Sequence, residues 1–159
     1  MELVLRTASE QATREAGRAL AGLLEPNDVL ALTGDLGAGK TALTKGVGRG
    51  LGVCENVVSP TFNILLVHEG RLTLFHLDLY RLDSAAQLED IDFFGTLEAG
   101  GVSVIEWGER FPEALPADHL SVVMRITGDE SREITLVPGG TRSAELALAW
   151  ATAAEGGSS

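Results

Sequence analysis

The chain has 159 residues and a formal net charge of −11 at pH 7, from 23 acidic and 12 basic residues. Its length and its 45% hydrophobic content favour one globular domain with a sizeable buried core. The negative charge repels nucleic acid, so any action on nucleic acid requires a more basic partner. A single cysteine, Cys54, excludes an intramolecular disulfide.

Strands and helices are predicted in alternation along the chain. Short apolar or alternating stretches predict strands at residues 2–6, 29–32, 63–68, 72–79, 102–108, 120–127 and 132–137. Composition and spacing predict helices at residues 10–24, 42–51, 84–94 and 143–154. Thr7 or Ser9 can cap the first helix, and Ser84 the third. The order predicts an α/β fold with a mixed β-sheet flanked by helices.

A glycine-rich stretch follows the second predicted strand. Gly34, Gly39, Lys40 and Thr41 fit the phosphate-binding pattern G-x-x-x-x-G-K-[ST]. The glycines let successive backbone N–H groups point into one concavity, and the following helix adds the positive end of its dipole. Lys40 supplies a positive charge for phosphates and Thr41 a hydroxyl for Mg²⁺. The alternative is a glycine-rich turn without a ligand. We therefore expect a P-loop NTPase-like fold.

Hydrolysis or phosphoryl transfer also needs an acidic group near Mg²⁺. Asp78 and Glu106 both lie at the ends of predicted strands, where ligands of open α/β sheets collect. The alternation of residues 75–80 places Asp78 on one face with His76 and Tyr80. The alternatives are a cap or ion-pair role for Asp78 and a solvated strand end for Glu106. Either carboxylate qualifies by its location to position the attacking water.

Two further residues are candidates for the site. Thr61 stands after a proline in the interval where nucleotide switches often carry a threonine that senses the γ-phosphate, although Ser-Pro-Thr is also a common turn. Trp107 follows Glu106 and either packs or lines the site. The three histidines do not form a metal-ligand set; they are His68, His76 and His119.

Four short motifs together resemble the TsaE family, formerly called YjeE. In chain order they are GDLGAGKT at 34–41, SPTF at 59–62, HLDLYR at 76–81 and IEW at 105–107. The resemblance covers roughly residues 1–137. It implies a small bacterial ATPase that is required for threonylcarbamoyladenosine (t6A) formation in tRNA.

The resemblance also implies roles for single residues. Thr41 and Glu106 would hold Mg²⁺, and Glu10 would lie near the nucleotide base. Asp78, Thr61 and Trp107 would be needed for hydrolysis, together with Lys40. The loop that wraps the phosphates of ATP would comprise Leu36, Gly37, Ala38, Gly39, Lys40 and Thr41.

The implied partners are the TsaB and TsaD proteins, with tRNA reached only through that complex. TsaD would transfer the threonylcarbamoyl group to an adenosine next to the anticodon, and ATP hydrolysis would reset the complex. A small-molecule P-loop kinase and a nucleotide-gated binding module without turnover are the alternatives.

We predict a P-loop ATPase domain at 1–138, then a C-terminal helix and disordered tail at 139–159. No signal peptide or membrane span is predicted, so we expect a cytoplasmic protein.

Overall fold

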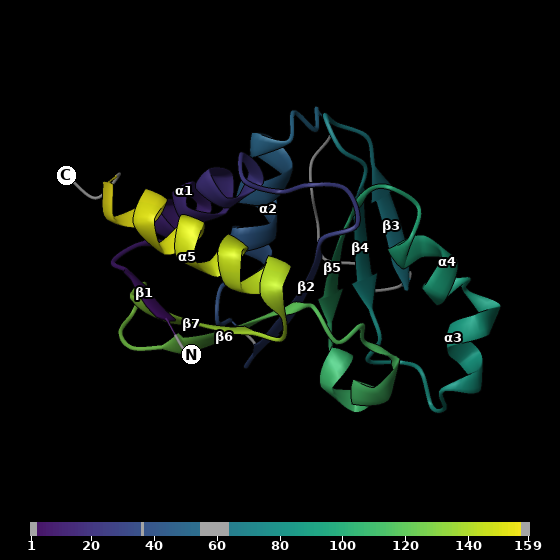
Figure 1. Cartoon of the computed structure of the whole chain (residues 1–159). Coiled ribbons are helices and arrows are strands. Elements are labelled where there is room, and N and C mark those ends of the chain that lie inside the picture. Colours follow the sequence, from purple (N-terminus) through teal and green to yellow (C-terminus); the bar gives the residue numbers. More distant parts are fainter. Residues whose placement is uncertain (1–2, 36, 55–63, 157–159) are drawn as a thin grey trace.

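The computed structural model describes residues 3–35, 37–54 and 64–156. Within these residues, seven strands form one sheet in the order β1-β7-β6-β2-β5-β4-β3 (Figure 1). The strands are β1 Leu3–Thr7, β2 Val29–Gly34, β3 Leu65–His68, β4 Leu74–Asp78, β5 Val102–Glu106, β6 Leu120–Ile126 and β7 Arg132–Pro138. Each predicted strand is confirmed to within about two residues at the ends that the structure describes.

The sheet is mixed, as predicted. The four central strands β4, β5, β2 and β6 run parallel to one another. The outer pairs β3–β4, β6–β7 and β1–β7 are antiparallel. The strand order puts β5 between β2 and β4, so the carboxyl ends of these three parallel strands meet at one edge of the sheet.

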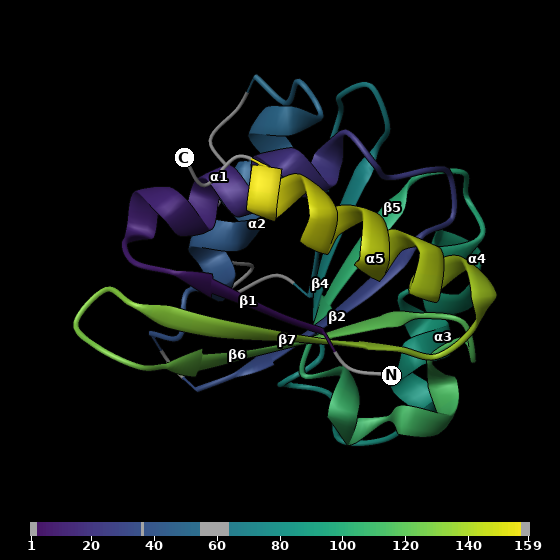
Figure 2. The same ribbon diagram turned by 60° about the vertical axis from the view of Figure 1, so that its left-hand side comes forward.

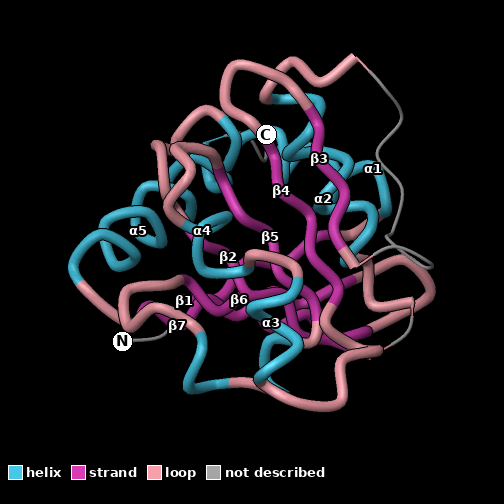
Figure 3. Tube along the Cα trace, turned by 90° about the vertical axis from the view of Figure 1, so that its right-hand side faces the viewer, coloured by secondary structure: helices cyan, strands magenta, loops and turns pink. Residues whose placement is uncertain are grey.

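Helices cover both faces of this sheet. On one face lie α1 Glu10–Ala21, α2 Lys40–Gly50 and α5 Thr141–Gly156, and α5 crosses in front of the sheet in Figure 2. On the opposite face lie the short helices α3 Ala86–Asp90 and α4 Phe93–Leu97 (Figure 3). Two 3-10 turns, Gly108–Arg110 and Pro112–Ala114, follow β5. The result is two hydrophobic clusters, one on each face of the sheet.

Glycines let α1 and α2 approach closely. A Cβ atom added at Gly17 would lie 2.2 Å from the carbonyl oxygen of Leu43, and one at Gly46 would lie 2.0 Å from that of Arg14. These distances are far shorter than any van der Waals contact, so neither position accepts a side chain without a shift of the helices. Gly46 and Gly50 of the predicted helix at 42–51 therefore lie on the surface that packs against α1.

Helix α5 extends the core at the end of the chain. The prediction of a helix at 143–154 is confirmed, and its Trp150 is fully buried. The indole Nε1–H of Trp150 donates to the carbonyl oxygen of Ala16 at 2.9 Å. Arg142 donates two hydrogen bonds to the carboxylate of Asp28, at 3.0 and 2.8 Å, and anchors the start of the helix. Among the described helices, none is long and apolar enough to cross a membrane.

One helix prediction is wrong. Residues 84–94 form two short helices instead of one, because Asp92 adopts a left-handed backbone conformation with φ of 52°. Ser84 makes no capping side-chain bond, and Ala85 occupies the cap position of α3. The predicted start of the first helix is confirmed, because the Ser9 hydroxyl accepts the N–H of Ala12 at 3.0 Å, but the helix ends at Ala21 and not at residue 24.

Candidate functional site

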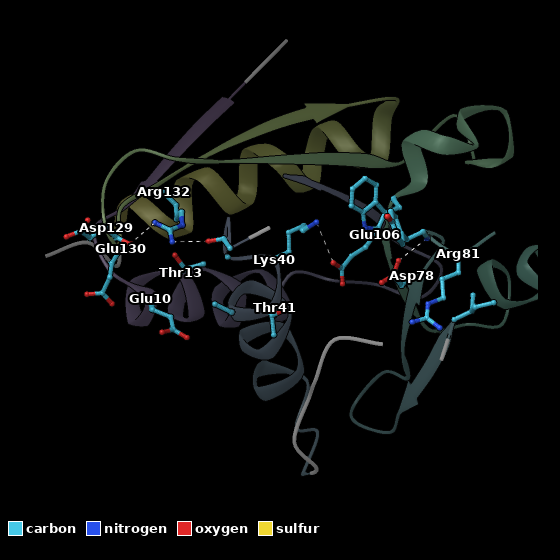
Figure 4. Close-up of a pocket in the computed structure, with 16 residues that line it drawn as sticks. Glu10, Thr13, Lys40, Thr41, Asp78, Arg81, Glu106, Asp129, Glu130 and Arg132 are labelled. Atoms are coloured by element: carbon cyan, nitrogen blue, oxygen red, sulfur yellow. Dashed lines mark hydrogen bonds and ion pairs between the residues drawn. The ribbon is translucent and has the colours of Figure 1, made fainter. Parts of the chain in front are cut away.

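A cleft of about 860 Å³ opens at the edge where β2, β4 and β5 end (Figure 4). Most of the predicted site residues line it: Glu10, Gly37, Gly39, Lys40, Thr41, Asp78, Glu106 and Trp107. Ala38, a residue of the glycine-rich loop, is fully buried. Leu36 and Thr61, with the whole SPTF motif at 59–62, lie outside the described residues. The structure thus brings together candidates that are spread over about a hundred residues of sequence.

The glycine-rich loop joins β2 to α2 along one wall of the cleft. Gly37 and Gly39 have positive φ angles of 84° and 101°, which L-residues with a side chain rarely adopt. Gly39 is the cap residue of α2, and no side chain of the described residues caps the helix there. The first N–H groups of α2 are therefore not used by a side-chain cap. Such an N-terminus, next to the Lys40 ammonium, suits an anionic ligand.

Arg132, which also lines the cleft, holds this loop by hydrogen bonds. From the first position of β7, its Nε and Nη2 atoms donate to the carbonyl oxygens of Ala38 and Gly37 at 3.1 and 3.0 Å. Its Nη1 atom donates to carbonyls of the β6–β7 turn, including that of Ser131 at 2.8 Å. The guanidinium therefore ties the loop to the turn. Sequence reasoning missed this residue, since nothing in the local sequence links residue 132 to residue 38.

The two candidate carboxylates stand side by side on neighbouring strands. Asp78 and Glu106 are register partners in the parallel pair β4–β5. Glu106 is buried, with 4% of its surface exposed. Its Oε1 atom lies 3.8 Å from Lys40 Nζ, and its Oε2 atom lies 2.6 Å from His76 Nε2. Figure 4 shows the Lys40 side chain extending toward Glu106. Glu106 is thus held between two basic groups and is not the solvated strand end considered as its alternative.

The environment of Asp78 differs from that of Glu106. Burial raises the pKa of the Asp78 carboxyl above its ordinary value of 3.8, and the nearby Glu106 carboxylate raises it further. The backbone N–H of Tyr80 donates to Asp78 Oδ1 at 3.0 Å and lowers this pKa, as do the charges of His76 and Lys40. The net shift is upward. Asp78 therefore makes the local capping bond considered above and also faces the cleft.

Trp107 forms the wall at this end of the cleft. It is partly buried, and its indole centre lies 5.1 Å from Lys40 Nζ and 5.0 Å from the ring centre of Tyr80. Its backbone is left-handed, with φ of 64°. Arg110 donates a hydrogen bond to the carbonyl oxygen of Tyr80. The indole packs against the hydrophobic cluster on the face of the sheet that α3 and α4 cover, and it also lines the cleft. The two interpretations of Trp107 are therefore compatible.

The other end of the cleft is acidic. Glu10 is the first residue of α1, and it lines the cleft with Asp129 and Glu130 from the β6–β7 turn. In Figure 4 these carboxylates lie beyond Lys40 and Thr41, at the end away from Glu106. Arg14 forms an ion pair with Glu10 at 2.9 Å. The cleft therefore runs from hydrogen-bond acceptors at one end, past the glycine-rich loop, to the Lys40–Glu106 pair.

These features define an α/β protein with a phosphate-binding sequence motif between β2 and α2. The family model described as threonylcarbamoyl adenosine biosynthesis protein TsaE matches residues 7–134. The chain belongs to the TsaE family, as the four motifs predicted. The family is named for the biosynthesis of threonylcarbamoyladenosine in tRNA.

Individual relatives agree with this assignment. The tRNA threonylcarbamoyladenosine biosynthesis protein TsaE of Treponema pallidum is 44% identical over 136 residues, covering 86% of this chain and 99% of the relative. The protein of the same name in Bacillus subtilis is 39% identical over 142 residues, 89% of each chain. The crystal structure of Bacillus subtilis YdiB superposes with a TM-score of 0.82 at 35% identity, covering 96% of this chain and 95% of that one.

Proposed function

We propose that this protein is a magnesium-dependent ATPase that binds and hydrolyses ATP in support of the TsaB–TsaD complex during t6A formation. One observation carries the proposal. The N-terminus of α2, the glycine-rich loop and the pair of Lys40 with the buried Glu106 all face one cleft of about 860 Å³. A triphosphate needs this combination of backbone donors, a cation and a carboxylate for Mg²⁺.

The phosphates would be held by the loop. Positive φ angles at Gly37 and Gly39 turn the backbone so that its N–H groups can converge, and Arg132 holds the loop carbonyls away from them. Lys40 would move from Glu106 to the phosphate oxygens, because these carry more negative charge. The acceptors Glu10, Asp129 and Glu130 suit the amino group of adenine at the other end.

Mg²⁺ would be held by the Thr41 hydroxyl and the Glu106 carboxylate. These hard oxygen donors fit this ion, and both line the cleft. When bound, Mg²⁺ neutralises charge on the phosphate oxygens. Asp78 then remains as the carboxylate that orients water, because it lines the cleft as the register partner of Glu106 on the neighbouring strand. Trp107 shields the Lys40 end from solvent, and Thr61 remains the proposed γ-phosphate sensor.

The proposed partnership accords with the charge of the chain. With a net charge of −11, the protein is unsuited to gripping tRNA on its own. We therefore assign tRNA contact to the partners.

The test measures phosphate release with and without purified TsaB–TsaD. We expect slow hydrolysis by the protein alone and acceleration by the pair. Lys40→Ala and Glu106→Ala should each abolish the accelerated rate, whereas Lys45→Ala, which removes the chain's other lysine on the same helix, should not. An unchanged accelerated rate in Lys40→Ala or Glu106→Ala would refute the assignment.

Two other outcomes would replace the proposal. ATP consumption that depends on a small metabolite and phosphorylates it would identify a kinase. If a non-hydrolysable ATP analogue supported partner assembly and repeated tRNA modification as well as ATP does, the protein would be a nucleotide-gated binding module.

A further inference from the structure

His76 has no role in the proposed function, yet it lies on a strand that is paired on both sides. It occupies β4, between β3 and β5, and is fully buried. Leu74 and Leu77 on the same strand are fully buried as well. A polar ring in such surroundings lowers the stability of the fold unless it is hydrogen-bonded. The packing of β4 alone therefore does not account for a histidine here.

The hydrogen bonding of the ring is one-sided. His76 Nε2 lies 2.6 Å from Glu106 Oε2, and within the described part of the chain His76 Nδ1 has no hydrogen-bond partner. An ionised carboxylate only accepts hydrogen bonds, so Nε2 carries the proton and donates it. Among the described residues the ring therefore makes one hydrogen bond, and that bond fixes one oxygen of Glu106.

The two oxygens of Glu106 are thereby given different neighbours. Oε2 is held by His76, whereas Oε1 lies 3.8 Å from Lys40 Nζ, which lines the cleft. If Lys40 turns toward a phosphate, its contact with Oε1 is lost. The hydrogen bond from His76 is then what keeps the carboxylate in its present rotamer.

We infer that His76 is a positioning residue: it holds Oε2 of Glu106 and so presents Oε1 to the divalent cation that enters with the nucleotide. The inference rests on the proposed function, because it requires Glu106 to be a metal ligand. Hydrogen bonds to the ligands of a metal orient them, and losing one typically weakens metal affinity by about 10- to 100-fold. His76 touches neither nucleotide nor cation itself.

The test compares two substitutions of His76. His76→Phe keeps a ring but removes the donor, whereas His76→Gln keeps an N–H donor. The measurement is the Mg²⁺ concentration that gives half-maximal binding of a non-hydrolysable ATP analogue, with a parallel titration in EDTA. For His76→Phe we expect this Mg²⁺ concentration to rise about 10- to 100-fold, while the affinity for the analogue in EDTA changes little. For His76→Gln we expect the Mg²⁺ concentration to stay near that of the unaltered protein.

His119→Phe alters a histidine bonded to Pro116 and Ser121, away from the cleft, and should leave the Mg²⁺ dependence unchanged. An unchanged Mg²⁺ dependence in His76→Phe would overturn the inference. If Glu106→Gln also left it unchanged, the proposed metal site itself would fail, and the two failures are thus distinguishable.

A second measurement needs no variant and covers the case in which His76→Phe does not fold. In the unaltered protein labelled with ¹⁵N-histidine, the Nε2 resonance of His76 should shift when Mg²⁺ is added to the nucleotide-bound state. That of His119 should not shift. If the Nε2 resonance of His76 did not shift on addition of Mg²⁺, the inference would be overturned.

Discussion

Trp150→Ala is expected to destabilise the whole protein, because α5 belongs to the hydrophobic cluster that it shares with α1, α2 and the sheet. Trp150 is fully buried and donates a hydrogen bond to α1 at 2.9 Å. Truncating a buried aromatic residue to alanine costs about 3–5 kcal/mol of unfolding free energy. Domains of this size have about 5–15 kcal/mol in total, so the loss is a large fraction. At about 2–4 °C per kcal/mol, the melting temperature should fall by roughly 6–20 °C.

The assay is unfolding by heat and by urea, followed by circular dichroism. Trp150→Phe keeps most of the ring but loses the donor, and should cost about 1–2 kcal/mol. It also leaves Trp107 as the sole tryptophan, so fluorescence then reports from the cleft. Leu148→Ala on the same helix is the control: its side chain is 56% exposed, and the change should stay within about 0.5 kcal/mol.

Two results would show that α5 is not part of the cooperative unit. If Trp150→Ala lost less than about 1 kcal/mol, or if circular dichroism and Trp107 fluorescence gave separate transitions, α5 would not unfold with the sheet.

Three further substitutions test the close contact of α1 with α2, the raised pKa of Asp78, and the hydrogen bonds from Arg132 to the glycine-rich loop. Gly17→Ala should cost about 1–3 kcal/mol of unfolding free energy, because its Cβ would lie 2.2 Å from a carbonyl oxygen of α2. Asp78→Asn should be more stable than the unaltered protein at neutral pH. The folded protein binds the Asp78 proton more tightly than the unfolded chain, so its stability falls as pH rises from about 3.8 through the raised pKa. Arg132→Ala should weaken ATP-analogue binding about tenfold, since losing a charged hydrogen bond costs about 1.5 kcal/mol or more.

Each of these has its own check. Urea titration compares Gly17→Ala with Gly22→Ala, whose nearest neighbour at 3.7 Å leaves room, and equal losses would contradict the steric argument. The melting temperature of each protein is measured from pH 3 to 8. Ionisation of Asp78 lowers the melting temperature of the unaltered protein as pH rises, and this contribution should be missing in Asp78→Asn. If the two proteins showed the same pH dependence, the raised pKa of Asp78 would be contradicted. Calorimetry compares the affinity of Arg132→Ala for the ATP analogue with that of Arg125→Ala, which alters an exposed arginine. Equal affinities would argue against a role of Arg132 in holding the loop.

The sequence predicts those parts of this structure that depend on local chemistry. Strand periodicity, the Ser9 cap and the glycine-rich loop can be predicted because each depends only on residues that are close together in the sequence. The break at Asp92 is not, because helical composition continues through it while the backbone turns left-handed.

Two contacts at the site depend on the strand order instead. His76 meets Glu106 across 30 residues, and Arg132 meets Ala38 across 94. The alternation along β4 places His76 and Asp78 on one face, but only the position of β5 beside β4 brings Glu106 to them. The register of neighbouring strands was not predictable from either strand taken alone.

The glycines between α1 and α2 have a consequence for how the site forms. Helix α2 carries Gly46, Gly48 and Gly50, and each glycine disfavours an isolated helix by about 1 kcal/mol relative to alanine. A helix of 11 residues with this composition does not persist alone in water. Its N-terminus therefore becomes available to a phosphate only once α2 is packed against α1 and the sheet. Folding of the N-terminal segment and assembly of the phosphate-binding loop are accordingly one cooperative event, and a ligand that binds the loop stabilises both.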